Sequence, residues 1–303
     1  MTHHFFGQDL LSKMGEELQF SEQARDAFLL GCQGPDPFFF TVRSARIVDR
    51  RRFGSHLQAE NIAKSIDVFR MASIVKPEDR QEAMQAYVRG WLAHLSLDSL
   101  AHPLIFYWEQ VLVNAGVKGL APDAAREVHA QIESDLDAML LQQKHEVTIR
   151  DFRPMNEVLL ASSKMLDWIG VMYRRVAAEV FAIKLPASAF RTAVQDMRLS
   201  YKTLYSPQGV KRSILGRMER IFRKHSMAQA TSHRVDVGES CDFDNHQHEA
   251  WENPFTGEKS TASFMDLYST ALEICATKQR LLTTRATSSE IAGPLNFAGS
   301  PVG

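Results

Sequence analysis

The feature that most constrains the fold of this chain is its apolar periodicity, which follows the three- and four-residue spacing of α-helices along most of its length. The clearest run covers residues 156–185, where the apolar positions are Leu159, Met165, Leu166, Ile169, Met172, Tyr173 and Val176. Similar patterns cover residues 21–30, 62–74, 78–102, 103–116 and 122–145, and a last helix begins near residue 261. Neither internal repeats nor the alternation typical of strands is found. The sequence therefore predicts an all-α fold, a single multi-helix bundle.

Glycine, proline and charge mark the ends of these helices. The sequence GCQGPDP after residue 30 cannot continue a helix, and the charged run 43–52 is expected to be a solvated loop. Pro103 disfavours the α conformation at His102, so one helix is expected to end there and another to begin at Pro103. Polar residues over about 226–260 predict a long loop inside one domain that spans 1–275, and residues 276–303 are expected to be a disordered tail.

Composition excludes several classes of protein. The 303 residues include 35 Lys and Arg against 36 Asp and Glu, a formal net charge of -1, so no nucleic-acid partner is expected. Three cysteines without CxxC spacing fit a reducing compartment and argue against a cysteine-based zinc ribbon. The first twenty residues lack the pattern of a secretory signal, and no apolar run reaches the ~18 residues that a membrane span needs. A cytoplasmic protein is therefore expected, of an oligomeric state that the sequence leaves open.

Histidine and carboxylate placement introduces chemistry. His94, Asp98 and His102 stand four residues apart in HLSLDSLAH, which leaves all three on one face of a helix. The next helix repeats the spacing with His129 and Glu133. Nitrogen and oxygen ligands that point the same way suit zinc or a similar divalent metal, and a carboxylate between two histidines can bridge two ions. The sequence therefore indicates a metal site with several ligands.

Each of these residues also has an ordinary structural interpretation. A His/Asp pair four apart on a helix is more often a surface hydrogen bond than a ligand set. Asp36 in the GPDP turn is typical of a turn former, His56 is expected at the start of a helix, and the His246/His248 pair is weak evidence for metal. The metal interpretation is favoured for the triad because Trp91 and four leucines flank it, and buried charge must be paired or bound to metal.

The ordered series of motifs resembles the bacterial zinc-dependent phospholipase C family, in particular its intracellular branch. The resemblance covers residues 2–137 through THHFFG, GCQGPDPFFF, the FGSH around His56, GWLAHLSLDSLAHP and HAQIESDLD. It extends more loosely to WENPFTGEKSTASFMDLY near the C-terminus. The resemblance implies an all-α bundle that holds two or three zinc ions at the bottom of a cleft.

The resemblance also implies the ligands, and in it Asp98 bridges to a third ion that His3, rather than His4, helps to hold. The implied ligands are Asp36, His56, His94 and Asp98 for one zinc, and His102, His129 and Glu133 for a second. Two departures stand out. In the secreted enzymes the mature N-terminal amine and carbonyl bind metal after signal cleavage, and the histidine after the bridging aspartate lies six residues on, whereas His102 lies four on.

These ligands predict a hydrolase. Two or three divalent ions lower the pKa of a bound water toward ~7 and neutralise the oxygens of a phosphorus centre. The expected activity is phospholipase C-like: a metal-bound hydroxide attacks the phosphorus of a phospholipid or a related soluble diester, with Asp36 as a candidate general base as well as a ligand. The alternatives are a non-catalytic, metal-stabilised helical binding protein and a zinc nuclease-like phosphodiesterase.

Two further segments carry expectations about substrate and membrane. On the resemblance alone, Trp251 lines or covers the cleft. Residues 209–226 form an amphipathic helix, with an apolar face of Val210, Ile214, Met218, Ile221 and Phe222 opposite Lys211, Arg212, Arg217, Arg220, Arg223 and Lys224. A core helix with a solvated face is the favoured interpretation, because the apolar stripe resembles those of the other helices. Peripheral contact with an anionic membrane is the alternative.

Overall fold

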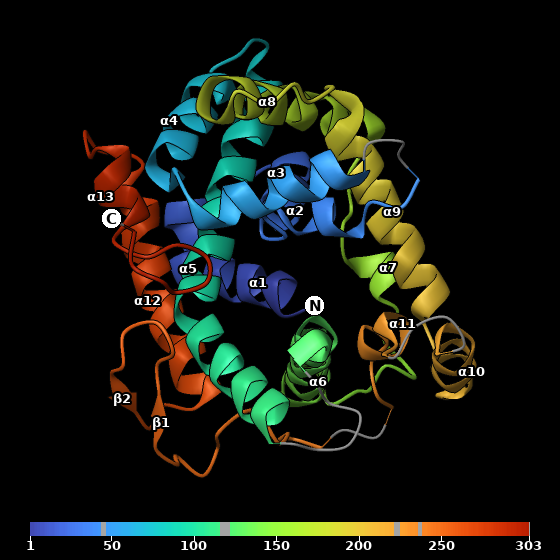
Figure 1. Ribbon diagram of the computed structural model, residues 1–303. Coiled ribbons are helices and arrows are strands. Elements are labelled where there is room, and N and C mark those ends of the chain that lie inside the picture. The colour runs from blue at the N-terminus through green and yellow to red at the C-terminus, as the bar shows by residue number, and fades with distance from the viewer. Residues whose placement is uncertain (44–46, 116–121, 221–224, 236–237, 303) are drawn as a thin grey trace. The chain divides into compact units, whose positions relative to one another are not determined.

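The structure is a computed structural model that describes residues 1–43, 47–115, 122–220, 225–235 and 238–302 (Figure 1). Over these residues 13 α-helices and three short 3₁₀ helices accompany one two-stranded sheet. The all-α prediction is confirmed. Among the described residues, no helix is both long enough and apolar enough to cross a bilayer.

The chain forms two compact units and passes between them several times. Unit 1 comprises Met1–Thr2, Ala101–Met155 and Tyr201–Tyr268. Unit 2 comprises His3–Leu100, Asn156–Ser200 and Ser269–Gly303. The extent of a single domain over 1–275 stays a prediction, although its end at residue 275 falls inside a helix, α12 (Phe264–Leu281).

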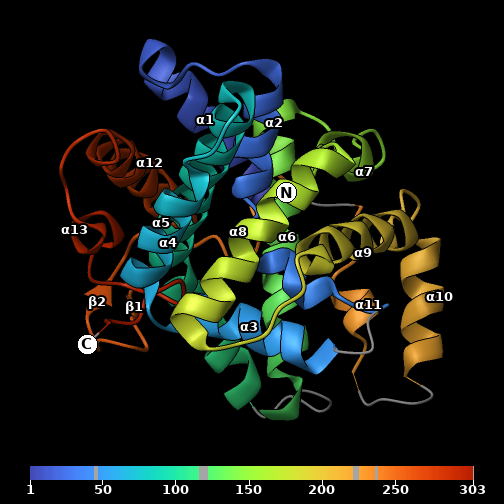
Figure 2. The ribbon, with the colours of Figure 1, turned by 90° about the horizontal axis from the view of Figure 1, so that it is seen from above.

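Unit 2 is a helical bundle around an aromatic core. Within it α4 lies beside α8 and α13 (Figures 1 and 2). The core includes Phe38, Phe53 and Tyr173, whose buried rings contact one another edge to face. Its helices, some shared with unit 1, are α1 (Thr2–Met14), η1 (Gly15–Leu18), α2 (Glu22–Gly31), η2 (Asp36–Phe40), α3 (Ile47–Ala59), α4 (Ile62–Ser73), α5 (Glu78–Asn114), α8 (Ser163–Phe181), α9 (Ser188–Leu204), α12 and α13 (Ser288–Ala292).

Serine side chains begin two of these helices. Ser21 accepts a hydrogen bond from the Ala24 amide at the start of α2, and Ser162 accepts one from the Met165 amide at the start of α8. Each serine satisfies an amide that the first helical turn leaves without a partner. The start of α8 therefore lies after the predicted start of the 156–185 helix, where a better cap is available.

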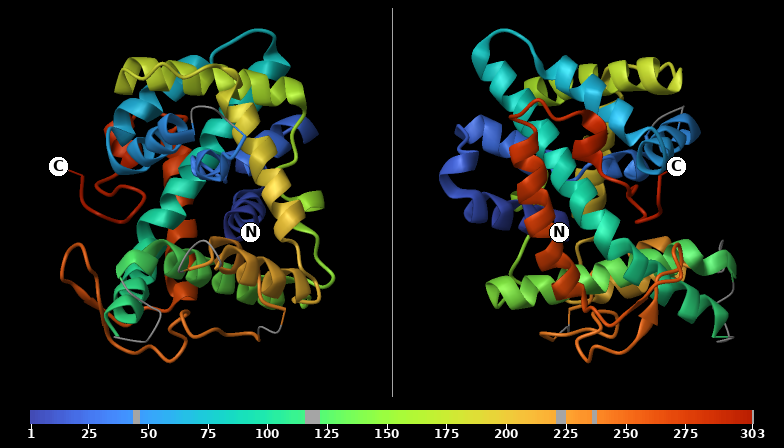
Figure 3. Two further views of the ribbon diagram at one scale, coloured as in Figure 1. Left: turned by 45° about the vertical axis from the view of Figure 1, so that its right-hand side comes forward. Right: turned by 90° about the vertical axis from the view of Figure 1, so that its left-hand side faces the viewer.

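Unit 1 combines helices with one β-hairpin. Its elements, apart from those named for unit 2, are η3 (Pro122–Ala124), α6 (Ala125–His145), α7 (Pro154–Glu157, whose last two residues fall in unit 2), α10 (Val210–Glu219), α11 (Met227–Ala230), β1 (Trp251–Glu252) and β2 (Lys259–Ser260). α11 packs against both α6 and α10 (Figures 1 and 3). β1 and β2 pair antiparallel with Trp251 opposite Ser260. The predicted loop over 226–260 therefore contains a short helix and both strands of the hairpin.

Pro103 does not end a helix, contrary to the sequence prediction. α5 runs without interruption for 37 residues through Pro103. The proline has no N–H to donate to the Ser99 carbonyl, so one helical hydrogen bond is missing. Ala101, Leu104 and Ile105 are buried on either side of the proline, and this tertiary packing outweighs the local preference. One continuous helix therefore carries His94, Asp98 and His102.

The charged run 43–52 was expected to be a loop, but part of it is helical. Residues 44–46 lie outside the described part of the chain, and α3 begins at Ile47. Arg50 and Phe53 lie three residues apart on the buried side of α3. The helical spacing was not recognised in the sequence because one of the two buried positions is an arginine. His56 consequently lies in the last turn of α3 rather than at the start of a helix.

The C-terminal segment 276–303 is ordered over its described residues, in contrast to the expected disorder. α12 continues to Leu281, and α13 follows with Thr287 and Glu290 forming a reciprocal cap. Phe297 is buried, with its ring 5.0 Å from that of Trp91. Because the segment is mostly polar and glycine-rich, the sequence pattern gave no sign that its few apolar residues are buried.

α10 is not a core helix, so the favoured interpretation of residues 209–226 is also wrong. Val210, Ile214 and Met218 are 56%, 51% and 58% exposed, and the buried residue of α10 is Gly216. Gly216 lies against Gln229 of unit 1, so α10 packs through its small and polar positions. Ile221, Phe222, Arg223 and Lys224 lie outside the described residues.

Candidate metal centres

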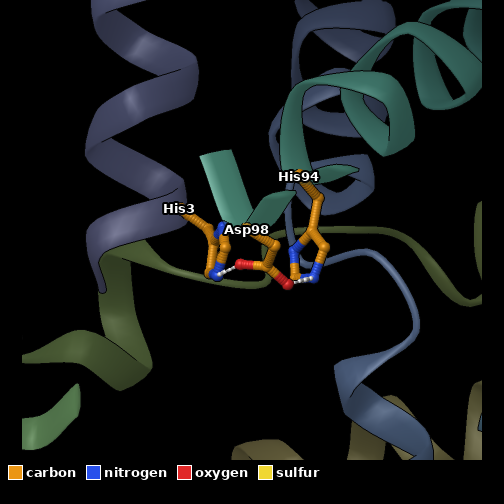
Figure 4. Close-up of side chains that lie close together, drawn as sticks. All are labelled: His3, His94 and Asp98. Carbon is orange, nitrogen blue, oxygen red and sulfur yellow. Dashed lines mark ion pairs between the residues drawn. The ribbon is translucent and has the colours of Figure 1, made fainter. Parts of the chain in front are cut away.

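His3, His94 and Asp98 form one group of potential metal ligands in unit 2, called the His3 cluster below. One ligand atom from each residue lies within 4.8 Å of the others. Figure 4 shows the Asp98 carboxylate between the two imidazole rings, 3.2 Å from His3 Nε2 through one oxygen and 2.9 Å from His94 Nε2 through the other. The rings stack with centroids 3.9 Å apart. His94 and Asp98 are buried, so the cluster presents nitrogen and oxygen ligands within the unit.

Close backbone packing fixes His94. A Cβ at Gly31 would lie 2.3 Å from the Tyr87 carbonyl oxygen, and one at Gly90 would lie 2.0 Å from the Phe28 carbonyl oxygen, so only glycines let α2 approach α5 this closely. Gly34 follows with φ +50°, and its Cβ would meet the His94 ring at 2.6 Å. The GCQGPDP sequence therefore turns directly against His94.

This turn also orients the His94 ring. His94 Nδ1 lies 2.9 Å from the Cys32 carbonyl oxygen and donates to it, which directs Nε2 toward Asp98. Burial opposes protonation of His94, but Asp98 and Asp36 outweigh it and raise the pKa of His94 to about 9. The proton on Nε2 thus occupies the position that a metal ion would take.

Asp36 approaches the His3 cluster from η2. Its Oδ1 lies 3.6 Å from His94 Nε2 and accepts a hydrogen bond of 3.1 Å from Gln58. The Asp36 side chain is partly exposed, so water reaches its carboxylate. Tyr173, buried in the core, donates to the Gly34 carbonyl at 3.0 Å and so holds the same turn.

His102, His129 and Glu133 form a second group in unit 1, called the His102 cluster below. Glu133 Oε1 lies 3.5 Å from His102 Nε2 and 3.4 Å from His129 Nε2, and again all three ligand atoms fall within 4.8 Å. The side chain of Glu133 is 46% exposed, while both histidines are half-buried. The His102 cluster is therefore more open to solvent than the His3 cluster.

A second carboxylate supports this cluster from α5. His129 Nδ1 donates to Glu109 Oε2 at 2.9 Å, which leaves Nε2 toward Glu133. Burial of the His129 ring opposes its protonation, but Glu133 and Glu109 outweigh that effect and raise the pKa of His129 to about 10. A carboxylate on the far nitrogen of a ligand histidine fixes the ring and makes it a stronger ligand.

The His102 cluster has the spacing of a zinc site, and the His3 cluster has it in part. A tetrahedral ion with ligands at ~2.1 Å separates neighbouring ligand atoms by about 3.4 Å. The 3.4 Å and 3.5 Å pairs of the His102 cluster match that edge and lie beyond the usual range of an N–H to O hydrogen bond. In the His3 cluster the 3.2 Å pair lies at the long limit of that range, whereas the 2.9 Å pair of His94 and Asp98 is an ordinary hydrogen-bond distance. The His102 cluster has three protein ligands, as in catalytic zinc sites, which keep one position open, whereas Asp36 is a fourth candidate ligand beside the His3 cluster.

Comparison with known proteins identifies the family. The family model described as zinc dependent phospholipase C matches residues 2–183, more than half of the chain. The chain belongs to this family. No curated protein and no solved structure matches it. The matched range includes every residue of both clusters. Both sets of potential zinc ligands therefore lie in the part of the chain that matches the family.

His56, a ligand that the resemblance implies, is not part of the group that His3, His94 and Asp98 form in the structure. Its Nδ1 pairs with Glu60 four residues on, and its Nε2 accepts from Arg52 at 3.4 Å. The ring lies 5.9 Å from that of Phe181. A role for His56 as a ligand stays a prediction: Nε2 would have to give up its contact with Arg52, whereas the pair of Nδ1 with Glu60 could remain, as the pair of His129 with Glu109 does.

The N-terminal amine, a ligand in the secreted enzymes of the resemblance, has another partner here. In unit 1 the Met1 amine donates to Asp137 Oδ2 at 2.7 Å, and the Thr2 amide donates to Asp137 Oδ1 at 2.6 Å. His233 Nε2 lies 3.0 Å from the same carboxylate. Asp137 therefore fixes the residues that directly precede His3.

Trp251 is a poor match for its predicted position lining a cleft. The side chain is 6% exposed, and its indole N–H donates to the Ala262 carbonyl at 3.0 Å. The exposed aromatic residue of this hairpin is Phe255. Trp251 anchors the hairpin, and a substrate contact for Trp251 itself stays a prediction.

Sequence reasoning missed two supporting groups. Glu109 follows His102 by seven residues, a spacing that places it on the same side of α5, but the predicted break at Pro103 hid the relation. The Cys32 carbonyl belongs to the backbone and carries no sequence signal, although the glycines around it mark the close approach.

Proposed function

We propose that this chain is a zinc-dependent phosphodiester hydrolase that acts on a phospholipid or a related soluble diester. The observation that carries the proposal is the pair of clusters, each with three nitrogen and oxygen ligand atoms within 4.8 Å of one another, in a member of the zinc-dependent phospholipase C family. The three protein ligands of the His102 cluster distinguish it from structural zinc, which has four and no open position. The non-catalytic alternative is therefore less well supported.

Zinc ions, when bound, lower the pKa of water and neutralise phosphate oxygens during in-line displacement. In the proposed reaction a water oxygen bonds to phosphorus as the bond from phosphorus to the glycerol oxygen breaks. One water proton finally resides on the glycerol oxygen, and the products are a diacylglycerol and a phosphomonoester. His3, His94, Asp98 and Asp36 would hold ions in unit 2, and His102, His129 and Glu133 would hold an ion in unit 1.

Asp36 is the proposed general base. Its partly exposed carboxylate can accept a proton from water, and Gln58 holds it by donating to Oδ1 at 3.1 Å. Glu109 does not act on substrate in this proposal. It orients His129 through Nδ1 and keeps the ligand nitrogen pointing at Glu133.

Activity assays on metal-stripped and zinc-reloaded protein test this function. The substrates are bis(4-nitrophenyl) phosphate and dihexanoylphosphatidylcholine, and the variants are Asp98→Asn and Glu133→Gln. His246→Ala, an exposed histidine paired with Asp244, is the matched control. We expect zinc to restore activity to the wild type and the control, and both cluster variants to lose it while keeping their helical circular dichroism.

Full activity without metal, or in both cluster variants, would refute the proposal. If chelation lowers the melting temperature and the zinc-loaded protein hydrolyses neither diester, the protein is instead a metal-stabilised binding protein. Cleavage of single-stranded DNA in place of these diesters would favour the nuclease-like alternative.

Contact of α10 with an anionic membrane is a related proposal. The exposed stripe of Val210, Ile214 and Met218 recurs every four residues, and Lys211 and Arg217 are exposed on the same helix. A short helix with an outward apolar stripe between basic residues suits the interface of an anionic bilayer.

The cytoplasmic location also stays a prediction.

Vesicle sedimentation tests this contact. The wild type is expected to sediment with vesicles that contain phosphatidylglycerol, less so at high salt, and not with pure phosphatidylcholine vesicles. Ile214→Glu should abolish sedimentation, whereas Ser213→Glu, the same added charge at the neighbouring exposed position, should only weaken it. Equal binding by the two variants would rule out insertion of the apolar stripe.

A further inference from the structure

Two phenylalanines of unit 1 extend from the His102 cluster. Phe106 lies on α5 four residues after His102, and its ring centroid is 4.9 Å from the His129 ring and 5.8 Å from the His102 ring. A single half-buried ring therefore contacts both histidine ligands. It provides an apolar wall beside a cluster whose glutamate is solvent-exposed.

Phe255 continues this wall from a different part of the chain. Its ring meets the Phe106 ring edge to face, with centroids 5.3 Å apart and planes at 85°. Phe255 is 37% exposed, although a phenylalanine gains from burial of its ring. An apolar group bound beside Phe106 would cover the remaining exposed surface.

The hairpin holds Phe255 in a defined position. The Asn253 amide donates to the Glu258 carbonyl at 2.8 Å, and the Gly257 amide donates to the Asn253 carbonyl at 2.8 Å. Asn253 Oδ1 accepts from the Phe255 amide at 2.9 Å. With Trp251 anchored at the other end, the ring is presented without the entropy cost of ordering a loose loop.

We propose that Phe106 and Phe255 form an apolar subsite that binds the glycerol and the first acyl carbons of a phospholipid whose phosphate is held at the His102 cluster. This inference rests on the proposed function and narrows its substrate class to diesters with an acylated glycerol. Phe106 lies within residues 2–183 and the hairpin that carries Phe255 lies outside them, so the family match covers only one of the two rings.

The ring geometry favours acyl carbons over a quaternary ammonium headgroup. An ammonium binds over the open face of an aromatic ring. Phe106 already contacts the His129 and Phe255 rings, and the two phenylalanines are nearly perpendicular, so they do not face each other across a gap. An apolar chain needs only contact area, which the exposed part of Phe255 supplies.

The test compares two substrates that share a headgroup, assayed with the zinc-loaded full chain. Dihexanoylphosphatidylcholine is used below its micelle concentration, which removes any contribution of α10, and 4-nitrophenyl phosphocholine lacks acyl chains. We expect Phe255→Ser to lower the ratio of kcat/KM for the lipid to that for the chromogenic diester by about tenfold to a hundredfold. Phe255→Leu should largely restore the ratio, and Glu258→Gln on the same hairpin should not change it.

An unchanged ratio in Phe255→Ser would overturn the subsite, as would an equal loss on both substrates, which would indicate a headgroup contact or a distorted site. Calorimetric binding of dihexanoylphosphatidylcholine provides a second readout, and Asp36→Asn, which removes the proposed general base, is combined with each protein so that the lipid is not hydrolysed during the titration. The wild type should bind about tenfold more tightly than Phe255→Ser, and equal or absent binding would overturn the subsite. Binding that depends on Phe255 in a protein that hydrolyses neither substrate would instead contradict only the proposed function.

Discussion

The two clusters use the same device with different supports. In each, a histidine donates from Nδ1 to an oxygen and directs Nε2 at a carboxylate, but His94 donates to the Cys32 carbonyl and His129 donates to the Glu109 side chain. The His3 cluster is largely buried behind a glycine-lined backbone contact, whereas Glu133 of the His102 cluster is exposed. The backbone therefore orients the ligand histidine of the His3 cluster, whereas a side chain that a single substitution can remove orients that of the His102 cluster.

Ligand substitution should separate the clusters most strongly. We expect Asp98→Asn to weaken zinc at the His3 cluster by more than about a hundredfold, beyond the effect of changing an outer-shell group, while the His102 cluster keeps its ion. Glu133→Gln should do the reverse. Elemental analysis after dialysis against a zinc buffer measures both, and loss of all zinc from either variant would show that the clusters are not independent.

Removing the carboxylate support should affect one cluster alone. Glu109→Gln is expected to weaken zinc at the His102 cluster by about tenfold to a hundredfold, because the ligand ring becomes less basic and less fixed. Competition with a chelating dye measures this affinity, and Gln110→Ala at the exposed neighbouring position is the control. An equal loss at the His3 cluster would contradict the separate supports.

Proton release should accompany zinc binding at both clusters. The pKa of His94 is about 9 and that of His129 is about 10, so below pH 9 both rings carry a proton that zinc must displace. Zinc affinity should therefore rise about tenfold per pH unit through neutrality, levelling off near pH 9 for the His3 cluster and near pH 10 for the His102 cluster. Calorimetry in buffers of different ionisation enthalpy counts the protons, and fewer than one per ion would contradict the assignment.

The smallest expected effect concerns Gln58. Its hydrogen bond to Asp36 is one partly exposed contact, worth about 0.5–1.5 kcal/mol, so Gln58→Ala should weaken zinc at the His3 cluster by about twofold to tenfold. The same dye competition applies. A loss as large as that of Asp98→Asn would mean that Asp36 is held far more firmly by Gln58 than one hydrogen bond allows.

Helical spacing made much of this site predictable. His94, Asp98 and His102 lie on one helix, and His129 and Glu133 lie four apart on the next, so periodicity alone places each set on one face. The fold class follows from the same periodicity and is confirmed. The prediction failed where tertiary packing overrides local preference, as at Pro103 inside α5 and in the segment that buries Phe297.

Other features depend on contacts that no spacing encodes. The exposure of Ile214 on α10 follows from which side of the helix meets α11, and the sequence pattern is the same for either side. The approach of His3 to Asp98 joins residues 95 positions apart, and family resemblance rather than periodicity indicated it. Phe255 beside Phe106 is a similar long-range contact.

Anomalous diffraction at the zinc edge from crystals of the zinc-loaded protein tests the central claim most directly. Two separate ligand sets predict anomalous peaks within about 2.1 Å of His94 Nε2 and Asp98 in one unit, and of His102 Nε2, His129 Nε2 and Glu133 in the other. A protein that binds zinc but shows no peak at either cluster would contradict the account.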